Sequence, residues 1–332
     1  MAANLTPQYL KAEEEYRRAH TPEEELAALQ LMLKELPKHK ASEKMQSDLK
    51  QKISKCKKEV EAEKKKGGSK GPSTRIPRQG AGTAAVIGGP NAGKSSLLAA
   101  LTRATPEIGD YPFTTRAPTP GMMPFEDVMV QLVDTPPITA DFFEPYMHGL
   151  IRGADLALLM LDLGSDDGVE QCQAVLDKLN STKTRLATRT YLDEEDVGLT
   201  FTKTFLVPNK IDDEGAAERY ELFRELCPLD FPVCKISIKT KAGLEELRKA
   251  VYEALDVVRV YTKMPMHKEA DMERPFTIRR GHTVLEVAGQ VHKDFVENFK
   301  FARVWGQHVH PGTQVKGDFV PSDKDVVELH VG

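Results

Sequence analysis

A glycine-rich loop that ends in a lysine and a serine offers the clearest chemistry in this sequence. Residues 88–95 read GGPNAGKS and match the pattern G-x-x-x-x-G-K-[ST]. Backbone N–H groups of such a loop can cradle phosphates, while Lys94 would neutralise the β- and γ-phosphates and Ser95 would ligate Mg²⁺. The pattern fits ATP and GTP equally well. The residues assigned to nucleotide binding here are Pro90, Asn91, Ala92, Gly93, Lys94, Ser95 and Ser96.

A second motif, N-K-x-D at residues 209–212, predicts which base is bound. The Asp212 carboxylate can accept both the N1–H and the exocyclic amine of guanine, whereas adenine would leave that carboxylate unpaired in a desolvated pocket. Guanine is therefore favoured, and an ATP-using enzyme of the same loop class is the less favoured alternative. Asn209 and Lys210 are assigned to the base together with Asp212, and Ser237 and Ile238 are expected to support it through main-chain contacts.

Between these two motifs lie the residues expected to hold a metal ion. Asp134 ends an apolar run and is placed to hold Mg²⁺ through its water shell. Residues 111–115, YPFTT, lie in a loop rich in Pro and Gly that is typical of a mobile switch. Thr115 is the candidate that closes over Mg²⁺ and the γ-phosphate. Lys94 and Thr115 are thus the candidate catalytic residues, and Ser95, Thr115 and Asp134 the candidate metal ligands.

These residues require an α/β framework that brings them together. From residue 83 the sequence alternates short apolar runs with helical stretches, which indicates a parallel sheet covered on both faces, with ligands at the carboxyl ends of its strands. We expect strands at 84–87, 128–133, 156–161, 204–207 and 233–236, and helices at 94–103, 142–152, 169–179, 216–226 and 244–255. This is a doubly wound domain at 83–262. The polar stretch at 184–203 is interpreted as an insertion over the sheet edge.

Two further parts flank this domain. Thr21 and Pro22 begin a helix that Pro37 ends, and a second helix is expected at 42–66, so residues 1–70 predict a basic helical hairpin. The sequence does not separate a docking arm for a large partner from a solvated hairpin whose apolar stripes pack only on each other. Residues 71–82 are interpreted as a flexible linker. A small α+β domain is expected at 270–332, with strands at 276–279, 301–304 and 326–331 and a helix at 284–295.

Composition excludes several classes of protein. The 332 residues carry 46 basic and 50 acidic side chains, a formal charge of −4 that gives no general reason to expect nucleic-acid binding, and DNA binding is not expected. The four cysteines form no C-x-x-C pair, so neither a zinc site nor a disulfide framework is indicated. The most apolar run, residues 156–161, is too short to cross a bilayer. We therefore expect a cytoplasmic protein without membrane contact.

Taken together, the segments GGPNAGKSS, YPFTTRAPTPG, DTPP and NKID resemble the Obg and HflX branch of translation-associated GTPases, especially the developmentally regulated GTP-binding proteins. Near the C-terminus, the segments FTIRRGHT, HKDF and FARVWG resemble the TGS domain, a small β-grasp module of the same proteins. The resemblance covers about residues 83–332. It implies GTP hydrolysis linked to ribosomes, with RNA or translation-factor contacts through the TGS domain. Trp305 and His308 are candidates for RNA stacking, although a core tryptophan and a surface histidine are the simpler interpretation.

Two departures from the family pattern concern hydrolysis. The family motif D-x-x-G has Pro137 at its glycine position, and proline has no N–H to offer a γ-phosphate. The next residue, where Ras-like proteins carry a water-orienting glutamine, is Ile138. Both favour an alternative function, a GTP-dependent binding scaffold with little or no hydrolysis. The resemblance also permits a potassium ion beside Asn91, which would supply charge against the phosphates.

Overall fold

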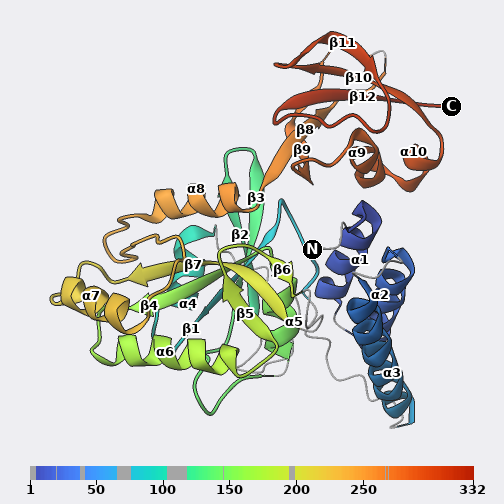
Figure 1. Cartoon of the computed structure of the whole chain (residues 1–332). Helices are drawn as coiled ribbons and strands as arrows, with labels where there is room; N and C mark the ends of the chain where they lie inside the picture. The colour runs from blue at the N-terminus through green and yellow to red at the C-terminus, as the bar shows by residue number, and fades with distance from the viewer. Residues whose placement is uncertain are drawn as a thin grey trace.

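The computed structural model describes residues 5–19, 21–37, 42–65, 76–102, 118–144, 146–193, 199–265, 267 and 269–332. The expected switch at 111–115, including Thr115, lies outside these residues, as do residues 71–75 of the expected linker at 71–82. The chain forms an N-terminal helical part, a central α/β domain and a C-terminal α+β domain (Figure 1).

In the described residues of the N-terminal part there are three helices rather than the expected hairpin of two. They are α1 (Pro7–Arg18), α2 (Pro22–Glu35) and α3 (Glu43–Lys65). As the capping pattern predicts, the Thr21 hydroxyl accepts a hydrogen bond from the Glu24 N–H at 3.1 Å. The unpredicted helix α1 buries only Tyr9, Ala12 and Tyr16 as apolar side chains, and these pack on α2 and α3 in one cluster. Its few apolar positions explain why periodicity alone did not indicate it.

In the central domain, the strands β1–β7 form one sheet. Its strands are β1 (Thr83–Gly88), β2 (Thr119–Phe125), β3 (Val128–Asp134), β4 (Leu156–Asp162), β5 (Thr184–Ala187), β6 (Tyr191–Leu192) and β7 (Thr200–Asn209). The order is β2-β3-β1-β4-β7-β5, with β6 paired to β7. All pairs are parallel except β2 with β3 and β6 with β7, which are antiparallel. The predicted doubly wound fold is confirmed.

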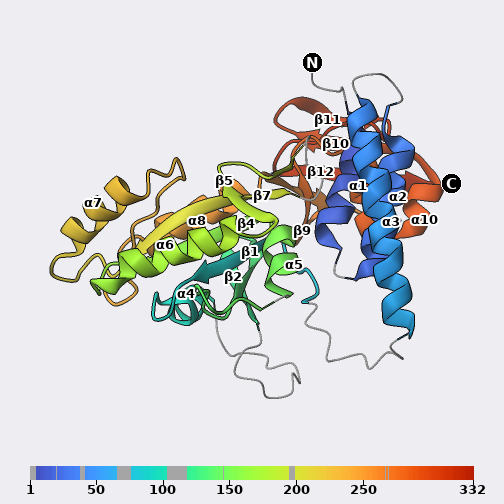
Figure 2. The ribbon, with the colours of Figure 1, turned by 60° about the horizontal axis from the view of Figure 1, so that its bottom comes forward.

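Helices cover both faces of this sheet because its inner strands are apolar on both sides. They are α4 (Lys94–Leu101), α5 (Tyr146–Gly153), α6 (Asp167–Asn180), α7 (Ala216–Leu226) and α8 (Leu244–Ala254). In β1, Ala84 and Val86 join the cluster under α4 and α8, while Ala85 and Ile87 join the one under α5, α6 and α7. Figures 1 and 2 show these two helical layers on opposite sides of the strands.

Some expected elements of the central domain need correction. Residues 233–236 make only an isolated bridge, Leu206 to Val233, together with a few backbone hydrogen bonds beside β7. The helix expected at 142–152 begins at Tyr146. The stretch at 184–203 contains β5, β6 and the start of β7, so part of the expected insertion belongs to the sheet edge itself.

The C-terminal domain begins earlier than the sequence indicated. Its elements are β8 (Val257–Thr262), β9 (Asp271–Arg279), α9 (Val284–Val291), α10 (Lys293–Glu297), β10 (Phe299–Gly306), β11 (Val309–Val315) and β12 (Asp325–Val331). They form a sheet in the order β11-β10-β12-β8-β9 with its own apolar core. Because β8 pairs with β12 and β9, residues 257–262 belong to this sheet. The domain boundary, which was expected between residues 262 and 270, therefore lies before β8.

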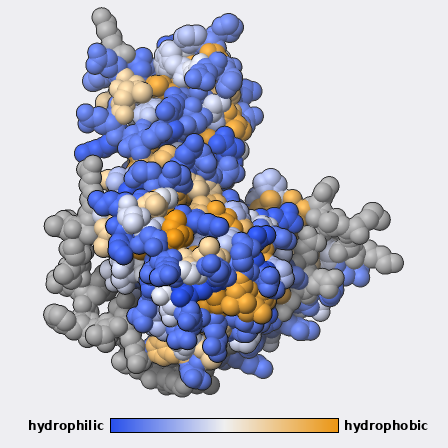
Figure 3. All heavy atoms as spheres, turned by 90° about the vertical axis from the view of Figure 1, so that its left-hand side faces the viewer, coloured by the Kyte–Doolittle hydropathy of each residue, from blue (hydrophilic) through white to orange (hydrophobic). Residues whose placement is uncertain are grey.

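Ionic contacts join the three parts. Arg152 of α5 reaches Glu25 of α2 at 2.6 Å, and Arg259 of β8 reaches Asp127 of the β2–β3 turn at 2.9 Å. Leu192 of β6 packs in the core cluster of the N-terminal helices, so the edge strand of the central sheet anchors them. On the face shown in Figure 3, hydrophilic side chains dominate and apolar ones gather over the central domain. Among the described residues, no helix is long and apolar enough to cross a membrane.

Candidate nucleotide-binding site

The predicted phosphate loop connects β1 to α4 and adopts a backbone that favours glycine. Gly93, which precedes the first residue of α4, has φ of 95°. A Cβ atom there would lie 2.4 Å from the Asn209 side-chain nitrogen, so both the left-handed backbone and the space require glycine. Asn91 also has a positive φ, 55°, in a conformation that asparagine tolerates better than most residues. The loop N–H groups and the N-terminus of α4 thus lie at the carboxyl end of β1.

Lys94 is buried and donates hydrogen bonds from its ammonium group to carbonyls of the loop itself. Its Nζ lies 2.6 Å from the Gly89 oxygen and 3.2 Å from the Gly88 oxygen. Burial lowers the pKa of Lys94, while the charge of Asp134 acts in the opposite direction. A cation held in low dielectric beside backbone N–H groups is suited to exchange these carbonyls for phosphate oxygens.

The two described candidate metal residues lie side by side, Asp134 at the end of β3 and Ser95 in the first turn of α4. The Ser95 hydroxyl donates a hydrogen bond to Asp134 Oδ2. Oδ1 of Asp134 is buried and has no hydrogen-bond partner among the described residues. Burial raises the pKa of Asp134, although the Ser95 hydrogen bond and the Lys94 charge act to lower it. A buried carboxylate oxygen without a partner, next to a hydroxyl, offers the oxygen ligands that Mg²⁺ prefers, so these residues fit the ion.

The base motif lies at the carboxyl end of β7, against the phosphate loop. The Asn209 amide donates a hydrogen bond to the Ala92 carbonyl at 3.0 Å, and Lys210 Nζ lies 2.6 Å from Asp162 Oδ2. Asp212 is beside Ser237, whose hydrogen bond lowers the Asp212 pKa, and its Oδ2 lies 3.5 Å from Lys239 Nζ. An ionised Asp212 is the form that can accept two guanine N–H groups.

The segment after Asp134, which corresponds to the second switch of GTPases, is hydrogen-bonded to β1 and to the residue at its end. The Thr135 hydroxyl donates to the Val86 carbonyl at 2.8 Å, and the Ile138 N–H donates to the Gly88 carbonyl at 3.1 Å. The Ile138 side chain is fully buried in the cluster under α5 and α6, whereas Pro137 is exposed. The structure therefore places Ile138 in the hydrophobic core, where it cannot orient water.

Of the other predicted residues, Ile238 packs at the core edge near Gly93, and its neighbour Ser237 is buried. Pro90 lies within the loop, and Ser96 is exposed on the first turn of α4. Sequence reasoning missed Asp162, the buried partner of Lys210 at the end of β4. Its position directly after a predicted strand was the available indication, because carboxyl ends of parallel strands carry the ligand.

Comparison with known proteins agrees with this geometry. The family described as 50S ribosome-binding GTPase matches residues 83–192, and the TGS domain family matches residues 258–329. An uncharacterized GTP-binding protein of Methanocaldococcus jannaschii is 30% identical over 92% of this chain and 92% of its own length. Developmentally-regulated G-protein 1 of Arabidopsis thaliana is 28% identical over 88% of this chain and 87% of its own.

Two further proteins complete the comparison. Ribosome-interacting GTPase 1 of Saccharomyces cerevisiae is 24% identical over 93% of this chain and 99% of its own length. The solved structure of the Schizosaccharomyces pombe YchF GTPase shares the fold, with a TM-score of 0.50 and 13% identity over 76% of this chain and 99% of that chain.

These matches span both domains, and the nucleotide motifs stand at the strand ends where a guanine-nucleotide site requires them. The resemblance to the Obg and HflX branch is a looser description of the chain than its match to the developmentally regulated G-proteins. The chain is a GTP-binding protein with a P-loop GTPase domain and a C-terminal TGS domain, and it belongs to the family of the developmentally regulated G-proteins.

Proposed function

We propose that the protein is a slow GTPase whose nucleotide state controls its association with ribosomes or translation factors in the cytoplasm. One contrast carries this proposal. Lys94, Ser95 and Asp134 would form a phosphate and metal cradle, whereas the position at which Ras-like proteins carry a water-orienting glutamine is held by Ile138, whose side chain is buried in the core. Such a site would hold GTP well and hydrolyse it slowly, which is the behaviour of a switch.

Two residues limit hydrolysis in this proposal. Pro137 offers no N–H to the γ-phosphate, and the Ile138 side chain is buried away from it. Lys94 would stabilise the charge that develops on the phosphate oxygens, and Thr115 would close over the site. Mg²⁺, held by Ser95 directly and by Asp134 through water, would neutralise phosphate charge when bound.

A potassium ion would supply a further charge beside Asn91. This residue is exposed at the loop and has a left-handed backbone conformation. We propose that hydrolysis is faster in potassium than in sodium salts, and that Asn91→Ala removes the difference. Equal rates of phosphate release in both salts would exclude the ion.

Ribosome association is supported by the names of similar proteins and by the charge of α3. A yeast relative is named Ribosome-interacting GTPase 1, and one family match is described as a 50S ribosome-binding GTPase. On α3, the exposed lysines Lys50, Lys55, Lys57 and Lys58 lie within one side of the helix, while Leu49 and Cys56 face the core. Lysines on an exposed helical face can contact RNA phosphates.

Charge reversal on α3 tests this part of the proposal. Lys55→Glu with Lys58→Glu should weaken binding to ribosomal subunits about tenfold or more and reduce its salt dependence, because two phosphate contacts would be lost. Arg224→Glu with Lys249→Glu makes the same change of charge on exposed positions of α7 and α8, and should leave binding almost unchanged. If both pairs weaken binding equally, α3 is not the contact surface.

A GTP-dependent scaffold without hydrolysis remains the second candidate, and Pro137 is the observation that favours it. Phosphate release measured with and without ribosomes separates the two functions. A slow basal rate that ribosomes stimulate supports the switch. No release under either condition supports the scaffold.

A further inference from the structure

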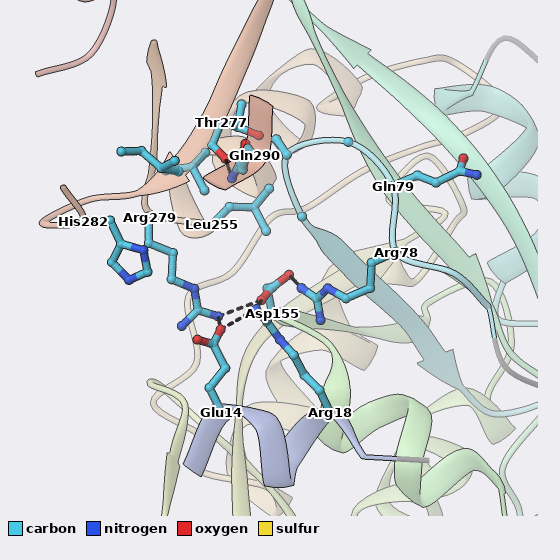
Figure 4. A pocket seen from close by; sticks show the side chains of 15 residues that line it. Glu14, Arg18, Arg78, Gln79, Asp155, Leu255, Thr277, Arg279, His282 and Gln290 are labelled. Carbon is cyan, nitrogen blue, oxygen red and sulfur yellow. Dashed lines mark hydrogen bonds and ion pairs between the residues drawn. The ribbon is translucent and has the colours of Figure 1, made fainter. Parts of the chain in front are cut away.

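The three parts of the chain meet at a polar pocket of about 230 Å³, far more than the ~10–15 Å³ that one water needs. It lies beside Asp155, whose backbone N–H bonds to Thr83 at the start of β1, so it is at the opposite end of the strands from the nucleotide site. Figure 4 shows its lining, which comes from α1, the segment before β1, the start of β4 and the C-terminal domain.

Positive charge exceeds negative charge among the side chains that line this pocket. Arg18, Arg78 and Arg279 contribute three positive charges, and Glu14 and Asp155 contribute two negative ones, which leaves a surplus of one before His282 is counted. In Figure 4, Arg78 and Arg279 approach Asp155 from opposite sides, and Arg18 approaches it from below.

Hydrogen-bond donors also exceed the acceptors that the two carboxylates provide. Arg279 donates a hydrogen bond to Asp155 at 3.0 Å and forms an ion pair with Glu14 at 2.6 Å. Arg18 forms ion pairs with the same two carboxylates, with Asp155 at 3.7 Å. Arg78 donates hydrogen bonds to Asp155 and to the Gly153 carbonyl. Three guanidinium groups carry about fifteen N–H donors, whereas two carboxylates offer about eight acceptor sites. The Nε of Arg18 is buried and finds no acceptor in the described part of the chain.

The arginines also repel one another. Burial, followed by the charge of Arg78, lowers the pKa of Arg18 to about 10. The neighbouring Arg17 is buried, and its pKa is lowered by burial and then by the charge of Arg279. An added anion would relieve both the repulsion and the lack of acceptors.

We propose that this pocket binds a small phosphorylated anion between the guanidinium groups of Arg18 and Arg279, with His282 as a further contact. Guanidinium forks match the spacing of phosphate oxygens and can bind them through two parallel hydrogen bonds. A small ligand fits better than a nucleic-acid backbone, because the site is concave and built from three separate parts. Since those parts must be docked to form it, the ligand would favour the docked arrangement.

The test uses the full chain saturated with GDP, so that the phosphate loop is already filled. Calorimetric titration with pyrophosphate, at constant ionic strength and without free Mg²⁺, should reveal one additional site. Arg279→Gln should weaken this binding at least tenfold, and Arg279→Lys less, because lysine keeps the charge and loses the fork. The matched control Arg280→Gln alters an exposed arginine outside the pocket and should bind as the unchanged protein does.

A second variant is needed because Arg279→Gln removes an ion pair between the domains and so could weaken binding by disturbing their packing. His282→Ala removes a lining side chain without breaking an ion pair to Asp155, and should weaken pyrophosphate binding several-fold while GDP affinity stays unchanged. Parallel titrations with inorganic phosphate and with a short single-stranded RNA identify the source of the phosphate. No pyrophosphate binding, an equal loss in Arg280→Gln, or binding of the RNA alone would overturn the proposal.

Discussion

The side-chain amide of Asn209 donates a hydrogen bond to the main-chain carbonyl of Ala92 at 3.0 Å, which joins the base motif to the phosphate loop. Asn209 is buried, and its amide nitrogen fills the space in which a Gly93 side chain would stand. The residues proposed for base recognition and for phosphate binding are therefore parts of one packed unit. A change in either loop should affect both.

Replacing Asp212 by asparagine should change which base is bound. The amide can no longer accept both guanine N–H groups, so GTP affinity should fall by about 2 kcal/mol, or roughly 30-fold, and binding of xanthosine triphosphate should improve. Competition titration with a fluorescent guanine nucleotide measures both effects. Asp213→Asn, at the adjacent exposed position, is the control, and unchanged GTP affinity in Asp212→Asn would remove the assignment of the base site.

Replacing Lys94 by alanine should abolish phosphate neutralisation without unfolding the loop. The buried ammonium would be lost together with its bonds to Gly88 and Gly89. We expect GTP affinity to fall by about 3 kcal/mol, more than 100-fold. Equilibrium dialysis can measure it, with Lys249→Ala on exposed α8 as the control. Wild-type affinity in Lys94→Ala would show that residues 88–95 do not bind phosphate.

Pro137→Gly should accelerate hydrolysis, because it introduces a backbone N–H that can donate a hydrogen bond to a γ-phosphate oxygen. Pro137 is exposed, so the change should leave the core and the free energy of unfolding nearly unaltered. We expect about a tenfold higher rate of phosphate release under single-turnover conditions. Pro124→Gly, in β2, is a control for a proline removed elsewhere. An unaltered rate would mean that Pro137 does not limit hydrolysis.

Asp155 should make the stability of the folded protein depend on pH. Burial would raise the pKa of this carboxyl, but Arg78, the Thr83 N–H, Arg18 and Arg279 outweigh it, so the pKa is lowered. A lowered pKa means that the carboxylate stabilises the folded state above its unfolded value of about 4, and that this contribution is lost as pH falls toward the folded value.

Asp155→Asn should therefore destabilise the protein by about 3 kcal/mol at pH 7, and by progressively less below pH 4. Urea unfolding with GDP present measures the difference. Asp256→Asn breaks an exposed pair with Arg280 and should cost less than about 1 kcal/mol. A difference between Asp155→Asn and the unchanged protein that does not shrink at low pH would contradict the ionic role of Asp155.

The sequence predicted the central sheet well where strands are buried on both faces, as in the runs that became β1 and β4. It missed β2 and β11, which contain Pro120, Pro124 and Pro311, because both are edge strands, where proline is tolerated. Helix α1 was missed because its stability depends on packing against α2 and α5 rather than on its own pattern.

The residues of the candidate nucleotide site could be predicted from the sequence because each motif is a short contiguous segment. The Asn209–Ala92 hydrogen bond and the core position of Ile138 could not be predicted, since both depend on how loops from different strands pack. The ion pairs of Asp155 could not be predicted for the same reason, because its arginine partners come from positions 18, 78 and 279 of the chain.

Co-sedimentation of the full chain with ribosomal subunits tests the central claim most directly. The protein is compared in GDP and in a non-hydrolysable GTP analogue, at several salt concentrations. Asp212→Asn is the control, at nucleotide concentrations that saturate the unchanged protein but not a variant with roughly 30-fold lower affinity. A GTPase switch predicts binding that is at least tenfold tighter in one nucleotide state, and that Asp212→Asn loses this difference. Equal binding of the unchanged protein in both nucleotide states, or no binding in either, would contradict the account.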